Sequence, residues 1–136
     1  MNEYNIEKYT AYLNSDQIQL LKGTIRNREI TKRAKKILLT TPLDHEAIGN
    51  LLTEHHIVLR NVLKISTLKI DRMIKSALKA GAYGAKINGS GGGGCMFAYA
   101  PGNTQKIKEA IEKEGGKAFI IHTDLGTLSS KFEIAL

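Results

Sequence analysis

The densest run of glycine in the sequence lies between two apolar stretches and comprises Gly89, Ser90, Gly91, Gly92, Gly93 and Gly94. Because glycine has no Cβ, such a run lets several backbone N–H groups converge and lets a ligand approach the backbone closely. A concave set of N–H donors suits a phosphate group. The segment is therefore a candidate phosphate-binding loop, and the alternative interpretation is a flexible hairpin turn.

Two common nucleotide-binding patterns do not describe this segment. Gly89, Gly91 and Gly94 match G-x-G-x-x-G, but a dinucleotide fingerprint must open a helix. The residues that follow, 95–100, form an apolar run of strand length instead. A phosphate-binding loop of the Walker type ends in Gly-Lys-Ser/Thr, whereas Gly94 is followed by Cys95. The sequence thus argues against both patterns.

Histidine and cysteine give no metal site or nucleophile. On a helix His45 and His56 would lie roughly 16 Å apart, too far to share one ion. His55 falls on an apolar stripe and is expected to be a histidine at the edge of the core. Cys95 begins an apolar run, and we expect it to be a small buried side chain. No metal site and no catalytic residue is predicted in this chain.

The strongest concentration of positive charge lies in residues 22–36, where Glu29 is the only acidic residue. The formal net charge of the whole chain is +7. Such a stretch suits phosphate or nucleic acid, and a solvated helix face is the simpler interpretation. It contains no aromatic side chain, which argues against stacking on single-stranded nucleic acid. Binding to nucleic acid rests on charge alone and is not favoured.

Length and composition exclude several classes of protein. The chain has 136 residues, of which 42% are hydrophobic and 24% charged, so it suits one compact domain. A single cysteine excludes an internal disulfide and fits a cytoplasmic protein. The first residues do not resemble a secretory signal. The apolar runs are far shorter than the roughly 20 residues that span a membrane, so no membrane partner is expected.

Several helices are expected before the glycine run. Ser15 is a candidate cap for a short helix that Gly23 would end, and residues 27–39 have helical spacing up to the break at Thr41-Pro42. Asp44 is a candidate cap for the clearest helix, whose apolar stripe runs through residues 47–63. Ser66 is then expected to cap a helix that ends at Gly81.

The glycine run itself is expected to join two strands, at residues 83–88 and 95–100. A helix capped by Asn103 and strands at 118–121 and 132–136 would follow. This order predicts an α+β fold in which one antiparallel sheet packs against helices on one face. Residues 1–136 would form a single domain, with a basic helical lead-in at 1–41 and a core that carries the motifs at 42–136.

The residues around the glycine run resemble a known motif. Tyr83-Gly84-Ala85-Lys86-Ile87-Asn88, followed by the run and Cys95, resembles the third motif of the GHMP small-molecule kinases. That superfamily includes galactokinase, homoserine kinase, mevalonate kinase and phosphomevalonate kinase. The galactokinase form is G-A-[RK]-[ML]-T-G-[AS]-G-[FGW]-G-G-[CS]. This chain departs from it at Asn88, where threonine is usual.

The resemblance extends upstream and covers about residues 20–124. The triplet Glu54-His55-His56, followed by Ile65-Ser66 and Ile70-Asp71, is similar to a galactokinase stretch. There a helix with an E-S-H triplet leads to a V-S-x-x-x-[LI]-D segment, so His55 stands at the position of the serine. Residues 26–31 are similar to the arginine-bearing segment at the start of this region in bacterial galactokinase-like proteins.

This resemblance implies the ferredoxin-like C-terminal domain of a two-domain kinase, closest to galactokinase-like proteins. The family's N-terminal domain supplies a P-x-x-x-G-L-S-S-S type loop and the catalytic residue, and neither is found in this chain. We therefore expect the N-terminal domain to be the partner. Residues 89–94 would help to close the nucleotide site between the domains, their N–H groups facing the transferred phosphoryl group. Arg26, Arg28 and Lys86 are the possible domain-junction or anion contacts.

The complete enzyme would use ATP and Mg²⁺ to phosphorylate a hydroxyl of a small molecule, most closely a sugar. This chain alone would hold neither cofactor firmly and would be inactive. The alternative is a stand-alone, non-catalytic module with the same fold that binds a ligand or regulates. A half-enzyme would also expose the face that its partner domain covers, so we expect it to self-associate.

Overall fold

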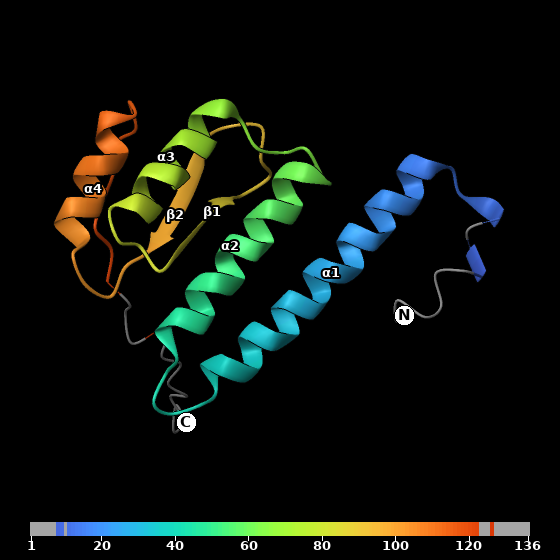
Figure 1. The fold of residues 1–136 in the computed structure, drawn as a ribbon, viewed down its shortest axis with the longest axis horizontal. Helices are drawn as coiled ribbons and strands as arrows, with labels where there is room; N and C mark the ends of the chain where they lie inside the picture. The colour runs from blue at the N-terminus through green and yellow to red at the C-terminus, as the bar shows by residue number, and fades with distance from the viewer. Residues whose placement is uncertain (1–7, 10, 123–125, 127–136) are drawn as a thin grey trace, which may run out of the picture.

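The computed structural model describes residues 8–9, 11–122 and 126 (Figure 1). In chain order the elements are α1 (Ser15–Leu38), α2 (His45–Asn61), α3 (Leu68–Lys79), β1 (Gly84–Asn88), β2 (Cys95–Tyr99) and α4 (Thr104–Lys113). The two strands pair antiparallel, with Gly84 opposite Tyr99 and Asn88 opposite Cys95. The predicted α+β fold with a glycine-linked strand pair is therefore confirmed.

α1 is one continuous helix and not the two that the sequence predicted. Its cap is Asn14, whose side chain accepts the N–H of Gln17 while the Gln17 side chain accepts the N–H of Asn14. Ser15 is the first helical residue and not the cap. Gly23 lies buried inside the helix, where a Cβ would sit 2.7 Å from Cγ1 of Val62. This glycine lets α1 approach the end of α2 and does not stop the helix.

α2 lies between α1 and the sheet and has two buried faces (Figure 1). Toward α1, Leu51 and Val58 pack with Ile30 in a small apolar cluster. On its other face His45, Gly49 and His56 are spaced four and seven residues apart, which aligns them on one side of the helix. Each of these three contacts the strand pair, so α2 is the element that positions the sheet.

The backbones of α2 and β1 touch directly. A Cβ on Gly49 would overlap the carbonyl group of Tyr83, and a Cβ on Gly84 would overlap the carbonyl group of Gly49. At the same end of the hairpin His45 Nδ1 lies 2.6 Å from the hydroxyl of Tyr99. These contacts fix the hairpin on α2 at the end opposite the glycine run.

The main core lies under the hairpin. It contains residues from α3, β1 and α4, among them Ile70, Met73, Ile74, Ala77, Ile87, Ile107 and Ile111. α3 is capped by Thr67, whose side-chain oxygen accepts the N–H of Ile70 at 3.3 Å, and not by Ser66. Asn103 does precede α4 as predicted, but its side chain makes no capping hydrogen bond.

Two further expectations are wrong, and a third concerns residues that the structure does not describe. Residues 118–121 are not a strand, and Phe119 and Ile121 are 72% and 83% exposed. Cys95 is exposed and not buried, because it follows directly on the exposed end of the glycine run. The strand expected at 132–136 lies outside the described residues.

No helix in the described part of the chain is long and apolar enough to span a membrane. Self-association stays a prediction.

Candidate phosphate-binding loop

The glycine run forms the loop that joins β1 to β2, and its shape depends on glycine. Five of its six residues have φ angles between +76° and +131°: Gly89, Gly91, Gly92, Gly93 and Gly94. L-amino acids rarely adopt this left-handed backbone, whereas glycine does so without penalty. We call residues 89–94 the glycine loop. Because five residues of the loop adopt this conformation, the loop has a defined backbone path, which argues against a flexible hairpin turn.

The inner side of the glycine loop docks on Ile65, in the segment between α2 and α3. The Gly92 N–H donates to the carbonyl oxygen of Ile65 at 2.7 Å. A Cβ on Gly91 would lie 2.5 Å from Cβ of Ile65 and 2.7 Å from its carbonyl oxygen. The Gly92 N–H therefore anchors the loop, and does not face a ligand as the sequence analysis expected of the loop's N–H groups.

The outer side of the glycine loop is open. A Cβ built on Gly89, Gly92, Gly93 or Gly94 would meet no atom of the described chain within 4 Å. Ser90 is also exposed. A group from outside the chain can therefore come close to the loop backbone from this side. An anchored inner side and an open, glycine-lined outer side fit a phosphate approached by backbone N–H groups.

Three polar side chains meet beside the anchor of the glycine loop. The Ser66 hydroxyl donates to Oδ1 of Asp71 at 2.6 Å, and His56 Nε2 lies 3.2 Å from the same oxygen. On its other side His56 Nδ1 accepts the N–H of Ile87 at 3.4 Å. This arrangement joins α2, α3 and β1 through one carboxylate. We call Ser66, Asp71 and His56 the polar triad.

His56 is 3% exposed. His55 is partly buried, as expected of a histidine at the edge of the core. The apolar stripe does not include His56, which lies on the face of α2 toward the sheet. The face toward the sheet is marked by Gly49, seven residues before His56. A glycine in a helix interior is the signal that could have shown this second face, because it marks close backbone contact.

Burial lowers the pKa of His56 below its ordinary value, while the hydrogen bond and charge of Asp71 act in the opposite direction. An Nδ1 atom that accepts from Ile87 also requires a neutral ring. Burial lowers the pKa of His55 as well, and the positive charge of Lys86 adds to this effect. Both rings are therefore neutral in the folded chain near pH 7.

These pKa shifts predict an acid-sensitive fold. Histidine in an unfolded chain takes up a proton near pH 6.5, whereas His56 in the fold does so only at lower pH. The unfolded state then binds more protons, so the free energy of unfolding falls as the pH drops below about 6.5. Three charged groups act on His56: Arg60 from α2, Asp71 from α3 and Lys86 from β1.

Urea unfolding between pH 5 and pH 7.5 measures this dependence. We expect His56→Gln, which removes one titrating ring, to make the profile shallower, while His55, whose pKa burial also lowers, keeps part of the slope. An equally steep fall in the variant would place its origin outside His56.

Lys86 lies on the strand that enters the glycine loop. Its Nζ is 5.3 Å from the ring centroid of Phe97, the residue opposite it in the sheet, and burial lowers the pKa of Lys86. Lys86 lies on this strand three residues before Gly89 and stays a candidate anion contact. Among the described residues no cluster of three metal-ligating side chains is found.

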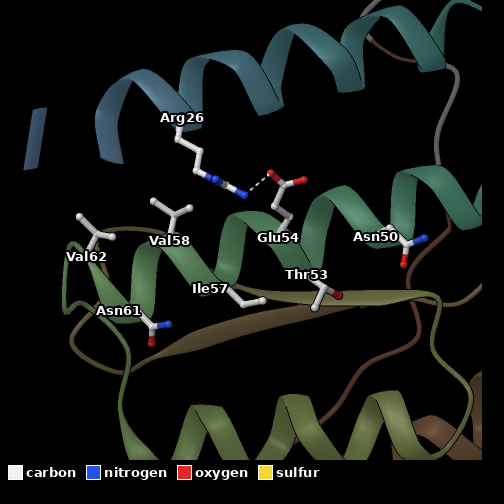
Figure 2. A pocket seen from close by; sticks show the side chains of 8 residues that line it. All are labelled: Arg26, Asn50, Thr53, Glu54, Ile57, Val58, Asn61 and Val62. Carbon is white, nitrogen blue, oxygen red and sulfur yellow. Dashed lines mark hydrogen bonds and ion pairs between the residues drawn. The ribbon is translucent and has the colours of Figure 1, made fainter. Parts of the chain in front are cut away.

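Arg26 and Arg28 are not brought to the glycine loop. Arg26 reaches from α1 to Glu54 on α2, with Nη2 3.1 Å from Oε1 (Figure 2). This pair lines an open groove of about 500 Å³ between the two helices, and no loop residue contributes to the lining. Arg28 pairs with its neighbour Glu29 at 2.9 Å. Arg33 also binds Glu54, at 3.1 Å, so Glu54 fastens α1 to α2 through two arginines.

Comparison with known proteins places this geometry in a family. Residues 34–118, well over half of the chain, match the family model described as GHMP kinases C terminal. The chain belongs to the GHMP kinase family and corresponds to its C-terminal domain. The matched segment begins inside α1 and includes the polar triad and the glycine loop.

Relatives from two branches of the family are similar to the chain. Mevalonate kinase from Thermococcus gammatolerans is 39% identical over 95 residues, which are 68% of this chain and 28% of that protein. Mevalonate kinase from Pyrococcus horikoshii is 40% identical over 92 residues, 65% of this chain and 27% of that protein. Galactokinase from Mycobacterium bovis is 43% identical over 58 residues, 43% of this chain and 16% of that protein.

A solved structure has the same fold. The crystal structure of L. major mevalonate kinase in complex with R-mevalonate covers 82% of this chain with a TM-score of 0.57 and 23% identity. The chain corresponds to 32% of that protein. The chain thus spans between a quarter and a third of the length of the mevalonate kinases that it matches.

Proposed function

We propose that this chain is the C-terminal domain of an ATP-dependent kinase that transfers the γ-phosphoryl group to the hydroxyl of a small molecule. The observation that carries the proposal is the glycine loop, held on Ile65 from the inside and open on the outside. Phosphoryl transfer depends mainly on positioning the phosphates and stabilising their charge. A fixed loop of backbone N–H groups suits both tasks.

Mevalonate is the substrate that the relatives support most strongly. The mevalonate kinases match about two thirds of this chain, whereas the galactokinase from Mycobacterium bovis matches 43% of it. The form of the third motif favoured a sugar. That motif is shared across the family, so the longer match supports mevalonate, and a sugar is the second candidate.

The residues present fit a role beside ATP and Mg²⁺. Bound together, these would supply the phosphoryl group and screen the charge of its oxygens. From this chain, the open backbone of Gly89, Gly93 and Gly94 would approach the phosphate without steric obstruction. Lys86 would add positive charge at the entrance of the loop. A partner N-terminal domain would supply the catalytic residue and the second phosphate loop.

Two measurements test this proposal. The chain alone, given Mg-ATP with mevalonate or galactose, should show no turnover above background, because a second half of the site is required. The native coding sequence upstream of residue 1 should continue in frame and encode a Gly-Leu-Ser-Ser-Ser type loop. Normal turnover by the chain alone would contradict the proposal. A stop codon with no such gene adjacent would favour the stand-alone binding module.

A further inference from the structure

We propose that the polar triad of Ser66, Asp71 and His56 is a positioning unit that holds the glycine loop in the shape in which its outer side can receive a phosphate. The purpose of this unit rests on the proposed function, whereas the anchoring itself can be measured without it. None of the three side chains is proposed to touch the substrate or ATP.

Ile65, the residue on which the loop docks, is held by its own backbone contacts. Its N–H donates to the carbonyl oxygen of Leu59 at 3.1 Å, and its own carbonyl accepts from Gly92. Lys64, just before it, has φ of +55°, a backbone conformation that surrounding contacts must hold in place for a residue other than glycine. The orientation of the Ile65 carbonyl is therefore imposed by its neighbours.

The next residue supplies the strongest of these restraints. The Ser66 hydroxyl donates to the Asp71 carboxylate at 2.6 Å, a short bond to a charged acceptor. Asp71 is fixed in turn by its place in the first turn of α3, where its N–H donates to the Thr67 carbonyl at 2.9 Å. The peptide that accepts from Gly92 is thus tied to the start of α3.

The strand that enters the loop is tied to the same carboxylate through His56. His56 binds the same Asp71 oxygen with Nε2 and accepts the N–H of Ile87 with Nδ1. Ile87 lies two residues before Gly89. Both supports of the loop, the carbonyl beneath it and the strand leading into it, therefore meet at one carboxylate oxygen. The path closes on itself through Gly92, Ile65, Ser66, Asp71, His56 and Ile87.

The chain offers a matched pair of hydroxyls to test this inference. Ser76 donates to the Glu114 carboxylate at 2.7 Å and is also part-buried, so it resembles Ser66 in chemistry but lies at the far end of α3. Amide hydrogen exchange at Gly92, followed by NMR on the isolated chain, reports the anchor directly. The amide of Ile107, which donates to Asn103 in the first turn of α4, reports a distant part of the fold.

We expect Ser66→Ala to raise the exchange rate of the Gly92 amide about tenfold, because a hydrogen bond to a charged group is lost. Ile107 should change less than twofold. Ser76→Ala should leave Gly92 within twofold, and Ser66→Thr, which keeps the hydroxyl, should restore slow exchange. If Ser66→Ala does not fold, Asp71→Asn keeps the acceptor oxygen but removes its charge, and we expect a rise of about threefold at Gly92.

Unchanged Gly92 exchange in folded Ser66→Ala, or an equal rise in Ser76→Ala, would overturn the positioning unit. An equal rise in Ser76→Ala would mean that the exchange rate of the Gly92 amide reports only the global stability of the fold. No nucleotide is present in this measurement, so its result is independent of the proposed function. Loss of anchoring in Ser66→Ala, together with an assembled two-domain protein that has no kinase activity, would contradict the proposed function and leave the positioning unit intact.

Discussion

Gly49→Ala is expected to lower the free energy of unfolding by about 3 kcal/mol, at the upper end of the range for overpacking in a core. Intrinsic helix propensity acts in the opposite direction, since alanine in a helix interior is favoured over glycine by about 1 kcal/mol. The steric effect dominates because the new methyl group overlaps the carbonyl group of Tyr83. Backbone cannot rotate away as a side chain can, so α2 and β1 must separate.

Gly23→Ala is the matched control, because Gly23 is also a buried glycine inside a helix. The obstacle there is the Val62 side chain at 2.7 Å, which can shift. We expect the loss to stay within about 1 kcal/mol after the gain in helix propensity. Urea unfolding of both variants measures the two losses in the free energy of unfolding. Equal losses at the two positions would contradict the backbone contact between α2 and β1.

Gly91→Ala is expected to detach the glycine loop from Ile65. A methyl group there lies 2.5 Å from Cβ of Ile65, and the residue has φ of +85°. The left-handed conformation alone costs about 1–2 kcal/mol for an L-residue. The overlap adds to this, so the loop should leave its docked position. In an assembled kinase we expect a loss of about 100-fold in kcat/KM, since small misplacements of a site have effects of that size.

Gly94→Ala separates the two causes. Gly94 has φ of +84°, almost the same as Gly91, but a methyl group there meets nothing within 4 Å. It should therefore retain the hydrogen bond from Gly92 to Ile65, visible as a shifted and slowly exchanging Gly92 amide, whereas Gly91→Ala should lose it. If both variants lost that bond, backbone strain rather than the contact with Ile65 would determine the shape of the loop.

Much of the helical fold could be predicted from the sequence, because its signals are local. The Asp44 cap begins α2 as predicted, and the apolar spacing after Ser66 gives α3. The wrong predictions concern a glycine inside a helix and an apolar segment that was expected to be a strand. Gly23 looked like a helix end, but a glycine can equally serve a close helix contact, and only the position of Val62 decides between them. Residues 118–121 are apolar enough for a strand but have no strand partner among the described residues.

The candidate site could be predicted only in part. The glycine loop was visible as a run of glycine, because the backbone conformation it needs is encoded in the residues themselves. Its anchor was not visible, since a backbone carbonyl such as that of Ile65 carries no signal in the sequence. The resemblance did mark His56, Ser66 and Asp71 as motif residues. That they meet at one oxygen depends on the packing of α2, α3 and β1.

We propose that this domain completes a phosphoryl-transfer site whose other half lies in a GHMP N-terminal domain. The most direct test fuses the N-terminal part of Thermococcus gammatolerans mevalonate kinase to this chain and measures phosphorylation of mevalonate and galactose with Mg-ATP. We predict turnover of mevalonate that neither part shows alone. It should fall about 100-fold in Gly91→Ala and persist in Gly102→Ala, an exposed glycine outside the loop with open space around it. A folded fusion that phosphorylates neither compound, under conditions in which the parent enzyme phosphorylates mevalonate, would contradict this proposal.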